Sequence, residues 1–224
     1  MNESITLDPR FNGPPDSGNG GYTSGLIAAR CAWPAVTVTL RTPPPLSAPL
    51  TLSGQDPVQV HHGEVLIAEA VEGALDTEPV PPVTLDEAMA VRDAYPGFAH
   101  HPFPTCFTCG PERPGGDGLR IFPGRIPDGR TAAVWQVPED VTPPMVWAAL
   151  DCPGGWTNEL EVTPRLLGRI TGQVRQMPQA GEKCLVMGRL DHSEGRKAKV
   201  TTTLYGAART VLAQASAVWI SIAR

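Results

Sequence analysis

The segment from 143 to 156 restricts the fold of this chain more than any other stretch of its sequence. It begins with Pro143 and Pro144, which suit the first turn of a helix because their missing N–H groups would be unpaired there anyway. Four apolar residues then follow at helical spacing: Met145, Val146, Ala149 and Leu150. This periodicity predicts a helix over 144–156 with one apolar face.

Long β-strands dominate the chain after this helix. Four segments have strand patterns and are separated by turn-forming residues: 170–176, 184–190, 198–204 and 211–222. A single helix followed by long antiparallel strands indicates a sheet wrapped around that helix. Two shorter strands, at 119–122 and 132–137, should lead into the helix.

The first half of the chain has the same order, a helix and then strands. A glycine-rich helix start at 16–31 is followed by alternating strand segments: 36–40, 50–52, 58–60 and 64–68. We therefore expect an α+β fold made by internal duplication, in which the two sheets join side by side. The helices near 18–32 and 144–156 should lie on the same face of the joined sheet.

The boundary between the halves falls in a proline-rich segment. Residues 76–83 have the composition of a linker. Thr84 can then cap a short helix, and Glu87 completes a capping box. We place the first unit at 1–83, a linker with this short helix at 84–99, and the second unit at 100–224.

Composition limits the partners of the protein. The net charge is −5 and only 18% of the residues are charged, which argues against a nucleic-acid surface. No run of about 18 apolar residues is present to span a membrane, and the first four residues lack the basic and apolar regions of a signal peptide. Five cysteines, an odd number, suit reduced thiols in a cytoplasm. We expect a cytoplasmic protein without nucleic-acid or membrane partners.

Asp151 interrupts the apolar helix between Leu150 and Cys152. A carboxylate buried there would be costly unless something compensates. Desolvation would raise its pKa, which makes a carboxylate a usable base near neutral pH. The alternative is an exposed aspartate on a polar helix face, or one that caps the end of the helix.

The first helix begins in a cluster of glycines: Gly18, Gly20, Gly21 and Gly25. Glycine at a helix start lets another backbone or a ligand approach closely, and the free N–H groups there attract partial negative charge. Tight packing of the helix on the sheet explains these glycines equally well. Their spacing does not fit a dinucleotide-binding loop.

Cys106 and Cys109 have the two-residue spacing of a zinc knuckle or a redox pair. A closed zinc site needs four ligands. The residues that could complete one are Cys31, Cys152, Cys184 and the pair His100–His101. None of them forms a second Cys-x-x-Cys, so we expect Cys106 and Cys109 to be reduced and metal-free, and we expect no cofactor. The pair His61–His62 is expected in a hairpin loop, because no third ligand lies at a suitable spacing.

Two passages resemble a known group of enzymes. Cys106-Phe-Thr-Cys-Gly-Pro-Glu-Arg113, followed by Gly118-Leu-Arg, resembles the Cys-Phe-x-Cys-Gly-Pro…Gly-Leu motif of phenylacetate-type thioesterases. Asn19-Gly20-Gly21 at a helix start resembles the His/Asn-Gly-Gly of the same superfamily. The resemblance implies the hotdog fold, in which an antiparallel sheet wraps around a long helix. Two such units in one chain, forming a pseudo-dimer, resemble acyl-CoA thioesterase II.

The resemblance also implies a site shared between the two units. Asp151 matches the acidic residue that the superfamily carries on the central helix, whereas the first unit has Ala28 at that spacing. The second unit has Thr142-Pro143-Pro144 where the Gly-Gly would fall. Each half therefore keeps one part of the site.

Two polar residues that tandem enzymes carry on their strands are matched unequally. A threonine after the second helix helps to hold the water, and Thr171 is the nearest match. The glutamine of the last strand has no counterpart: Ala217 occupies its place, with Gln214 and Ser216 nearby.

The activity that the resemblance implies is hydrolysis of an acyl-CoA or a related acyl thioester. The glycine-rich start of the first helix would polarise the carbonyl, and Asp151 would activate water or attack directly. The expected catalytic residues are Asp151, Asn19 and Thr171, and the expected substrate contacts are Gly20, Gly21, Tyr22 and Trp147. No metal takes part in this scheme, and two such chains can form a homodimer.

A ligand-binding module is the alternative function. A degenerate tandem hotdog could hold an acyl chain or an aromatic ligand without hydrolysing it, and the missing glutamine favours this alternative. A dehydratase would need an aspartate and a histidine on one short segment after the helix start, and the sequence has no such pair.

Overall fold

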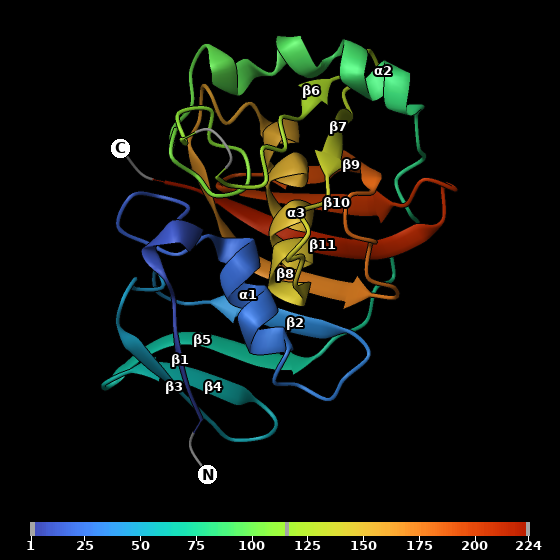
Figure 1. Ribbon diagram of the computed structural model, residues 1–224. Coiled ribbons are helices and arrows are strands. Elements are labelled where there is room, and N and C mark those ends of the chain that lie inside the picture. Colours follow the sequence, from blue (N-terminus) through green and yellow to red (C-terminus); the bar gives the residue numbers. More distant parts are fainter. Residues whose placement is uncertain (1–2, 115–116, 223–224) are drawn as a thin grey trace.

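The computed structural model describes residues 3–114 and 117–222. In this part of the chain, eleven strands form one antiparallel sheet, and helices α1 (Gly20–Ala28) and α3 (Pro143–Gly155) lie side by side against one face of it (Figure 1). The strands of the first half are β1 (Glu3–Thr6), β2 (Val36–Leu40), β3 (Pro49–Ser53), β4 (Val58–His62) and β5 (Val65–Glu72). Those of the second half are β6 (Gly124–Arg125), β7 (Thr131–Gln136), β8 (Arg165–Val174), β9 (Lys183–Glu194), β10 (Lys197–Tyr205) and β11 (Val211–Ser221).

The order of the strands confirms the internal duplication. The sheet runs β1-β3-β4-β5-β2-β8-β11-β10-β9-β7-β6. The two halves meet at β2 and β8, each of which is the first strand after the helix of its half. The next strand outward is the last strand of each half, β5 in the first and β11 in the second. At the junction Val38 pairs with Ile170 and Thr37 with Thr171. The two sheets therefore join side by side, as the repeated order of elements predicted.

Helices α1 and α3 approach each other through glycines. A Cβ atom added at Gly21 would lie 2.6 Å from the Cβ of Asp151, and one added at Gly25 would lie 2.6 Å from the Cα of Pro144. Only glycine, which has no Cβ, permits this spacing. The close-packing explanation of the glycine cluster therefore holds at these two positions, where the packing partner is α3.

The linker between the halves covers the outer face of the second sheet. The N–H of Val80 donates to Thr203 Oγ1 at 2.9 Å, and the hydroxyl of Tyr205 donates to the carbonyl of Val80 at 2.6 Å. Gln214 on β11 donates to the carbonyl of Thr77 at 2.7 Å on the same side. We keep the division into 1–83, 84–99 and 100–224 as a proposal. Residues 1–2, 115–116 and 223–224 of those ranges lie outside the described residues.

The short helix after the linker, α2 (Leu85–Ala90), forms as predicted. Thr84 caps it, and the reciprocal bonds between Thr84 and Glu87 make the expected capping box. Helix α3 also begins with Pro143 in its first turn. None of the helices in the described ranges has the length and the apolar character needed to cross a membrane.

Two local predictions were wrong. Residues 119–122 form no strand, because Arg120 adopts a left-handed backbone conformation (φ 53°) and the segment bonds to a loop instead. The N–H of Leu119 donates to the carbonyl of Phe107 at 2.8 Å, and β6 begins only at Gly124. His61 and His62 belong to strand β4 and not to the hairpin loop. In this position His62 Nδ1 lies 3.2 Å from the carbonyl oxygen of Pro49.

Candidate active site

Asp151 lies at the junction between the two halves, where α3 faces the N-terminus of α1. The residue is 2% exposed. Its Oδ2 accepts a hydrogen bond from the backbone N–H of Gly21 at 2.9 Å. Its Oδ1 is buried and has no hydrogen-bond partner among the described residues. One carboxylate oxygen is thus held by the protein and the other is free to meet a ligand or water.

The surroundings of Asp151 change its protonation. Burial raises the pKa of this carboxyl group to about 8, although the hydrogen bond from Gly21 acts in the opposite direction. The positive end of α1 also favours the charged form. A carboxyl group with a pKa near neutrality can both take up and return a proton during a reaction.

Asn19 shapes the start of α1. Its Oδ1 accepts from the N–H of Tyr22 at 2.8 Å, which makes Asn19 the N-cap of the helix. Its Nδ2 donates to Cys106 Sγ at 3.6 Å. The N–H of Gly21 donates to Asp151, whereas the N–H of Gly20 forms no hydrogen bond with the described part of the chain. Of the two glycines considered from the sequence, only Gly20 therefore has a free donor.

Two adjoining cavities open beside these groups. The inner one, of about 50 Å³, lies between the halves and is lined by Asp151, Asn19 and Gly20 among others. The outer one, of about 230 Å³, is lined mainly by the segment that leads into α1, by the end of β2 and the residues after it, by the first part of β8 and by the end of β11. The residues that line both cavities are Pro14, Gly20, Leu166 and Leu167. A ligand in the outer cavity can therefore reach towards Asp151.

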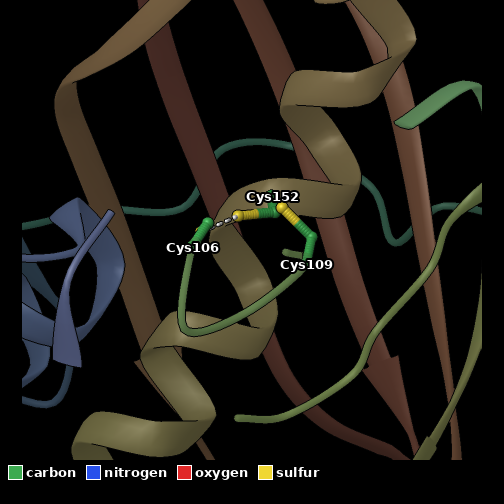
Figure 2. Close-up of side chains that lie close together, drawn as sticks. All are labelled: Cys106, Cys109 and Cys152. Carbon is green, nitrogen blue, oxygen red and sulfur yellow. Dashed lines mark hydrogen bonds between the residues drawn. The ribbon is translucent and has the colours of Figure 1, made fainter. Parts of the chain in front are cut away.

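Three cysteines meet at the wall of the inner cavity. Cys106 and Cys109 come from the loop that precedes β6, and Cys152 follows Asp151 on α3 (Figure 2). Their sulfur atoms all lie within 4.8 Å of one another, and those of Cys106 and Cys152 are 3.9 Å apart. From the sequence Cys152 was only one of several residues that could join the pair. The sequence feature that could have singled out Cys152 is its position next to Asp151. The structure shows that Cys152 lies on the side of α3 that faces the loop of Cys106 and Cys109.

The structure places Thr171 away from this site, which corrects its expected role. Thr171 Oγ1 lies 2.8 Å from Thr37 Oγ1, and Thr171 lines neither cavity. The cause is a β-bulge: Leu167 and Arg169 pair with successive residues of β11, so Gly168 is an extra residue that reverses the alternation of side chains beyond it. Ile170 is then buried under the helices, and Thr171 points to the opposite face.

Tyr22 and Trp147, the other expected substrate contacts, lie outside the two cavities beside Asp151. Tyr22 stacks on Phe11 with ring centroids 3.9 Å apart, and it lines neither cavity. Trp147 lies between α1 and β8, where a Cβ added at Gly172 would approach its ring to 2.7 Å. Both side chains are buried, and Trp147 also borders a separate cavity of about 150 Å³. The expected contacts that do line the inner cavity are Asn19, Gly20 and Asp151.

The last strand carries no polar side chain towards the site at the position where tandem enzymes have glutamine. Ala217 is buried, and Gln214 bonds to Thr77 in the linker on the other face of the sheet. The structure therefore agrees with the inference from the sequence that Ala217 takes the place of the glutamine. Gln214, the nearest amide on β11, points to the other face of the sheet and does not replace it.

Comparison with solved structures shows the same fold along the whole chain. A putative thioesterase from Novosphingobium aromaticivorans is 15% identical, with 99% of this chain and 96% of that chain covered at a TM-score of 0.63. A hot dog fold protein of unknown function from Alicyclobacillus acidocaldarius is 14% identical, with 100% and 94% covered at 0.63. A tesB protein from Mycobacterium avium subsp. paratuberculosis is 12% identical, with 99% and 93% covered at 0.63.

These likenesses show the fold: the chain has an α+β, double hotdog architecture, as its motifs implied. No family model matches the sequence. No curated protein matches it either. Function therefore has to be argued from the site itself.

Proposed function

We propose that the protein hydrolyses an acyl thioester, with acyl-CoA as the substrate class, at the junction between α1 and α3. The observation that carries this proposal is the environment of Asp151. Its Oδ1 has no hydrogen-bond partner among the described residues and lies beside a cavity, while the N–H of Gly21 bonds to Oδ2. The names of two whole-chain structural neighbours, a putative thioesterase and a tesB protein, support the same class of reaction.

The start of α1 supplies the group that polarises the substrate. The N–H of Gly20 lies at the positive end of the helix and forms no hydrogen bond with the described residues, and Gly20 lines both cavities. A thioester carbonyl oxygen placed there would accept from this N–H as negative charge develops on it. One such donor contributes roughly 3 kcal/mol to transition-state stabilisation.

Asp151 supplies the proton transfers. Its deprotonated Oδ1 takes a proton from water while the water oxygen bonds to the carbonyl carbon. The tetrahedral intermediate then collapses, the carbon–sulfur bond breaks, and the departing thiolate receives the proton from the carboxyl group of Asp151. Direct attack by Asp151 would instead form an acyl anhydride, which water then opens to the same products.

The outer cavity is suited to the rest of the substrate. Apolar side chains of Leu40, Leu166 and Ile220 line it, and Arg41 and Arg196 stand among its lining residues. Arg41 is paired with Glu69, whereas no carboxylate in the described residues lies within salt-bridge distance of Arg196. We therefore place the acyl and pantetheine parts along the apolar wall and a phosphate of coenzyme A near Arg196.

The test uses Asp151→Asn, which keeps the shape of the side chain and removes its ability to take up a proton. Release of free thiol is measured over a panel of acyl-CoA substrates for the wild type, Asp151→Asn and a control, Asp140→Asn, at an exposed residue. Hydrolysis should fall by about 100-fold or more in Asp151→Asn alone, as for loss of a general base. Turnover that is unchanged in Asp151→Asn would contradict the proposal.

A ligand-binding module is the second candidate, and specific observations favour it. Thr171 faces away from Asp151, and Ala217 replaces the glutamine of tandem enzymes. Wild-type protein that binds acyl-CoA in a calorimetric titration but releases no thiol from any member of the panel would select this function. Asp151 would then be a buried residue that joins α3 to the start of α1.

A further inference from the structure

Three thiols that the proposed hydrolysis does not use form one cluster: those of Cys106, Cys109 and Cys152 (Figure 2). Their sulfur atoms lie within 4.8 Å of one another, with 3.9 Å between Cys106 and Cys152. In tetrahedral zinc sites the zinc–sulfur distance is about 2.3 Å, which sets the sulfur atoms about 3.8 Å apart. The distance between Cys106 and Cys152 is therefore that of two corners of a zinc site, and the sulfur of Cys109 lies within 4.8 Å of both.

The sulfur atoms also receive N–H donors from the surrounding protein. Asn19 Nδ2 donates to Cys106 Sγ at 3.6 Å, and Trp156 Nε1 donates to Cys109 Sγ at 3.5 Å. His101 Nε2 lies 3.3 Å from Cys109 Sγ. Its Nδ1 accepts from the N–H of Phe103, so Nε2 carries the proton and donates to the sulfur. Donors of this kind surround metal-bound thiolates and orient them.

The loop that carries two of the cysteines is held in place by contacts that need no metal. Thr108 Oγ1 donates to the carbonyl of Ala148 on α3 at 3.3 Å. The N–H of Gly110 donates to the carbonyl of Cys106 at 2.8 Å, which closes the turn between the cysteines. Cys106 and Cys109 are thus presented to Cys152 by the fold itself, and binding a metal requires little rearrangement.

Charge decides what such a cluster can hold. The three cysteines are buried, and three buried thiolates need a compensating positive charge. In the described residues no arginine or lysine side chain is hydrogen-bonded to any of the three sulfur atoms. A divalent cation that prefers thiolate ligands supplies that charge, and zinc is the cation that such ligands commonly bind.

We propose that Cys106, Cys109 and Cys152 bind one zinc ion through three thiolates, with the fourth coordination position supplied from the inner cavity. His101 acts as a hydrogen-bond donor to Cys109 and is not a ligand, since its proton lies on the nitrogen that faces the sulfur. The proposal departs from the metal-free state expected from the sequence, which rested on the need for four protein ligands. Sites with three protein ligands and one exchangeable position are also common for zinc.

The first experiment measures zinc in the full-length protein. Reduced protein is freed of metal with a chelator, given zinc, desalted and subjected to elemental analysis. Wild type and Cys31→Ser, a control at a half-buried cysteine outside the cluster, should retain one zinc per chain. Cys106→Ser, Cys109→Ser and Cys152→Ser should retain almost none, while His101→Ala should keep the stoichiometry and lose roughly ten-fold in affinity.

A second measurement needs no variant. Cobalt replaces zinc in the wild type, and the absorption spectrum should show the sulfur-to-cobalt charge-transfer band of thiolate ligands. Absence of that band, absence of zinc in the wild type, or equal zinc in the three serine variants would overturn the proposal. Asp151→Asn should retain a full equivalent of zinc, so the metal site and the proposed hydrolysis can fail separately.

Discussion

The N–H of Gly21 donates to Asp151 Oδ2 at 2.9 Å across the junction of the two halves, between residues 130 positions apart in the chain. The bond depends on the absence of a side chain at Gly21, because a Cβ there would lie 2.6 Å from the Cβ of Asp151. The same contact therefore orients the candidate base and fixes the spacing of α1 and α3. Each half of the duplicated chain contributes one side of it.

Gly21→Ala should damage both stability and activity. The added methyl group forces α1 and α3 apart, which should lower the free energy of unfolding by roughly 1–3 kcal/mol and disturb the bond to Asp151. Gly25→Ala is the matched control, since its Cβ would also clash with α3 but against Pro144, away from Asp151. Denaturant unfolding should show similar losses for both variants, whereas thiol release should fall much further in Gly21→Ala. Equal activity in the two would contradict a special role for the Gly21–Asp151 bond.

Thr171→Val tests the corrected position of Thr171. The hydroxyl bonds to Thr37 on the face opposite the helices, so its removal should lower the free energy of unfolding by about 1 kcal/mol. Thermal unfolding and thiol-release kinetics can be measured on the same preparation. We expect kcat/KM to stay within about two-fold of the wild type, because Thr171 lines neither cavity and its loss removes no contact with the substrate or the transition state. A large loss of activity at normal stability would place Thr171 back in the reaction.

Arg196→Ala should weaken substrate binding without slowing the chemical step. The Nε and Nη2 atoms of Arg196 both donate to the carbonyl of Ser221, which holds the guanidinium at the outer cavity. An exposed charge pair with a phosphate is worth roughly 1 kcal/mol, so KM for acyl-CoA should rise about five-fold at unchanged kcat. Arg175→Ala, at an exposed arginine that lines neither cavity, is the control. Equal KM values in both variants would mean that the phosphates bind elsewhere.

Asp117→Asn should make stability less dependent on acid pH. Burial opposes the charged form of Asp117, but hydrogen bonds from Arg10 and Arg113 outweigh burial and lower its pKa below the usual 3.8. Because the folded state lowers this pKa, the charged pair stabilises the fold above the unfolded-state pKa and stops doing so as pH falls through the folded-state pKa. At pH 7 the free energy of unfolding of the variant should therefore be roughly 1–2 kcal/mol lower than that of the wild type.

The measurement is urea unfolding of both proteins between pH 7 and pH 3, with Asp76→Asn as an exposed control. The difference between wild type and Asp117→Asn should shrink below about pH 4 as the wild-type carboxylate takes up a proton. If the difference in the free energy of unfolding stays constant over this range, the negative charge of Asp117 does not contribute to stability through its contacts with the arginines.

The motif around Cys106 has a structural function that explains its arginine. Arg113 Nη1 donates to Asn12 Oδ1 at 2.7 Å and to the carbonyl of Thr105 at 2.6 Å, and Nη2 donates to the carbonyl of Arg10 at 2.7 Å. The side chain is only 7% exposed. Arg113 therefore ties the cysteine loop of the second half to the N-terminal segment of the first, beside the candidate site.

Sequence periodicity by itself determined the elements and their repetition. Apolar residues at helical spacing predicted the helix that became α3, and alternation predicted β8 to β11, because burial of one face imposes these periods on any such helix or strand. The strand prediction for residues 119–122 was wrong because hydrogen bonds to another loop hold this segment, with Arg120 in a left-handed conformation. Periodicity carries no information about such bonds.

Only the tertiary structure decided which atoms meet. Cys152 contacts Cys106, which lies 46 positions away. The resemblance already implied that Asp151 shares a site with the start of the first helix, and the structure identifies the N–H of Gly21 as the group that bonds to it. Thr171 shows the converse, since one extra residue at Gly168 turned it to the other face of the sheet. The sequence specifies local conformation through short-range sterics and burial, whereas the candidate site arises where two duplicated units join, and that geometry is set by how their helices and sheets pack.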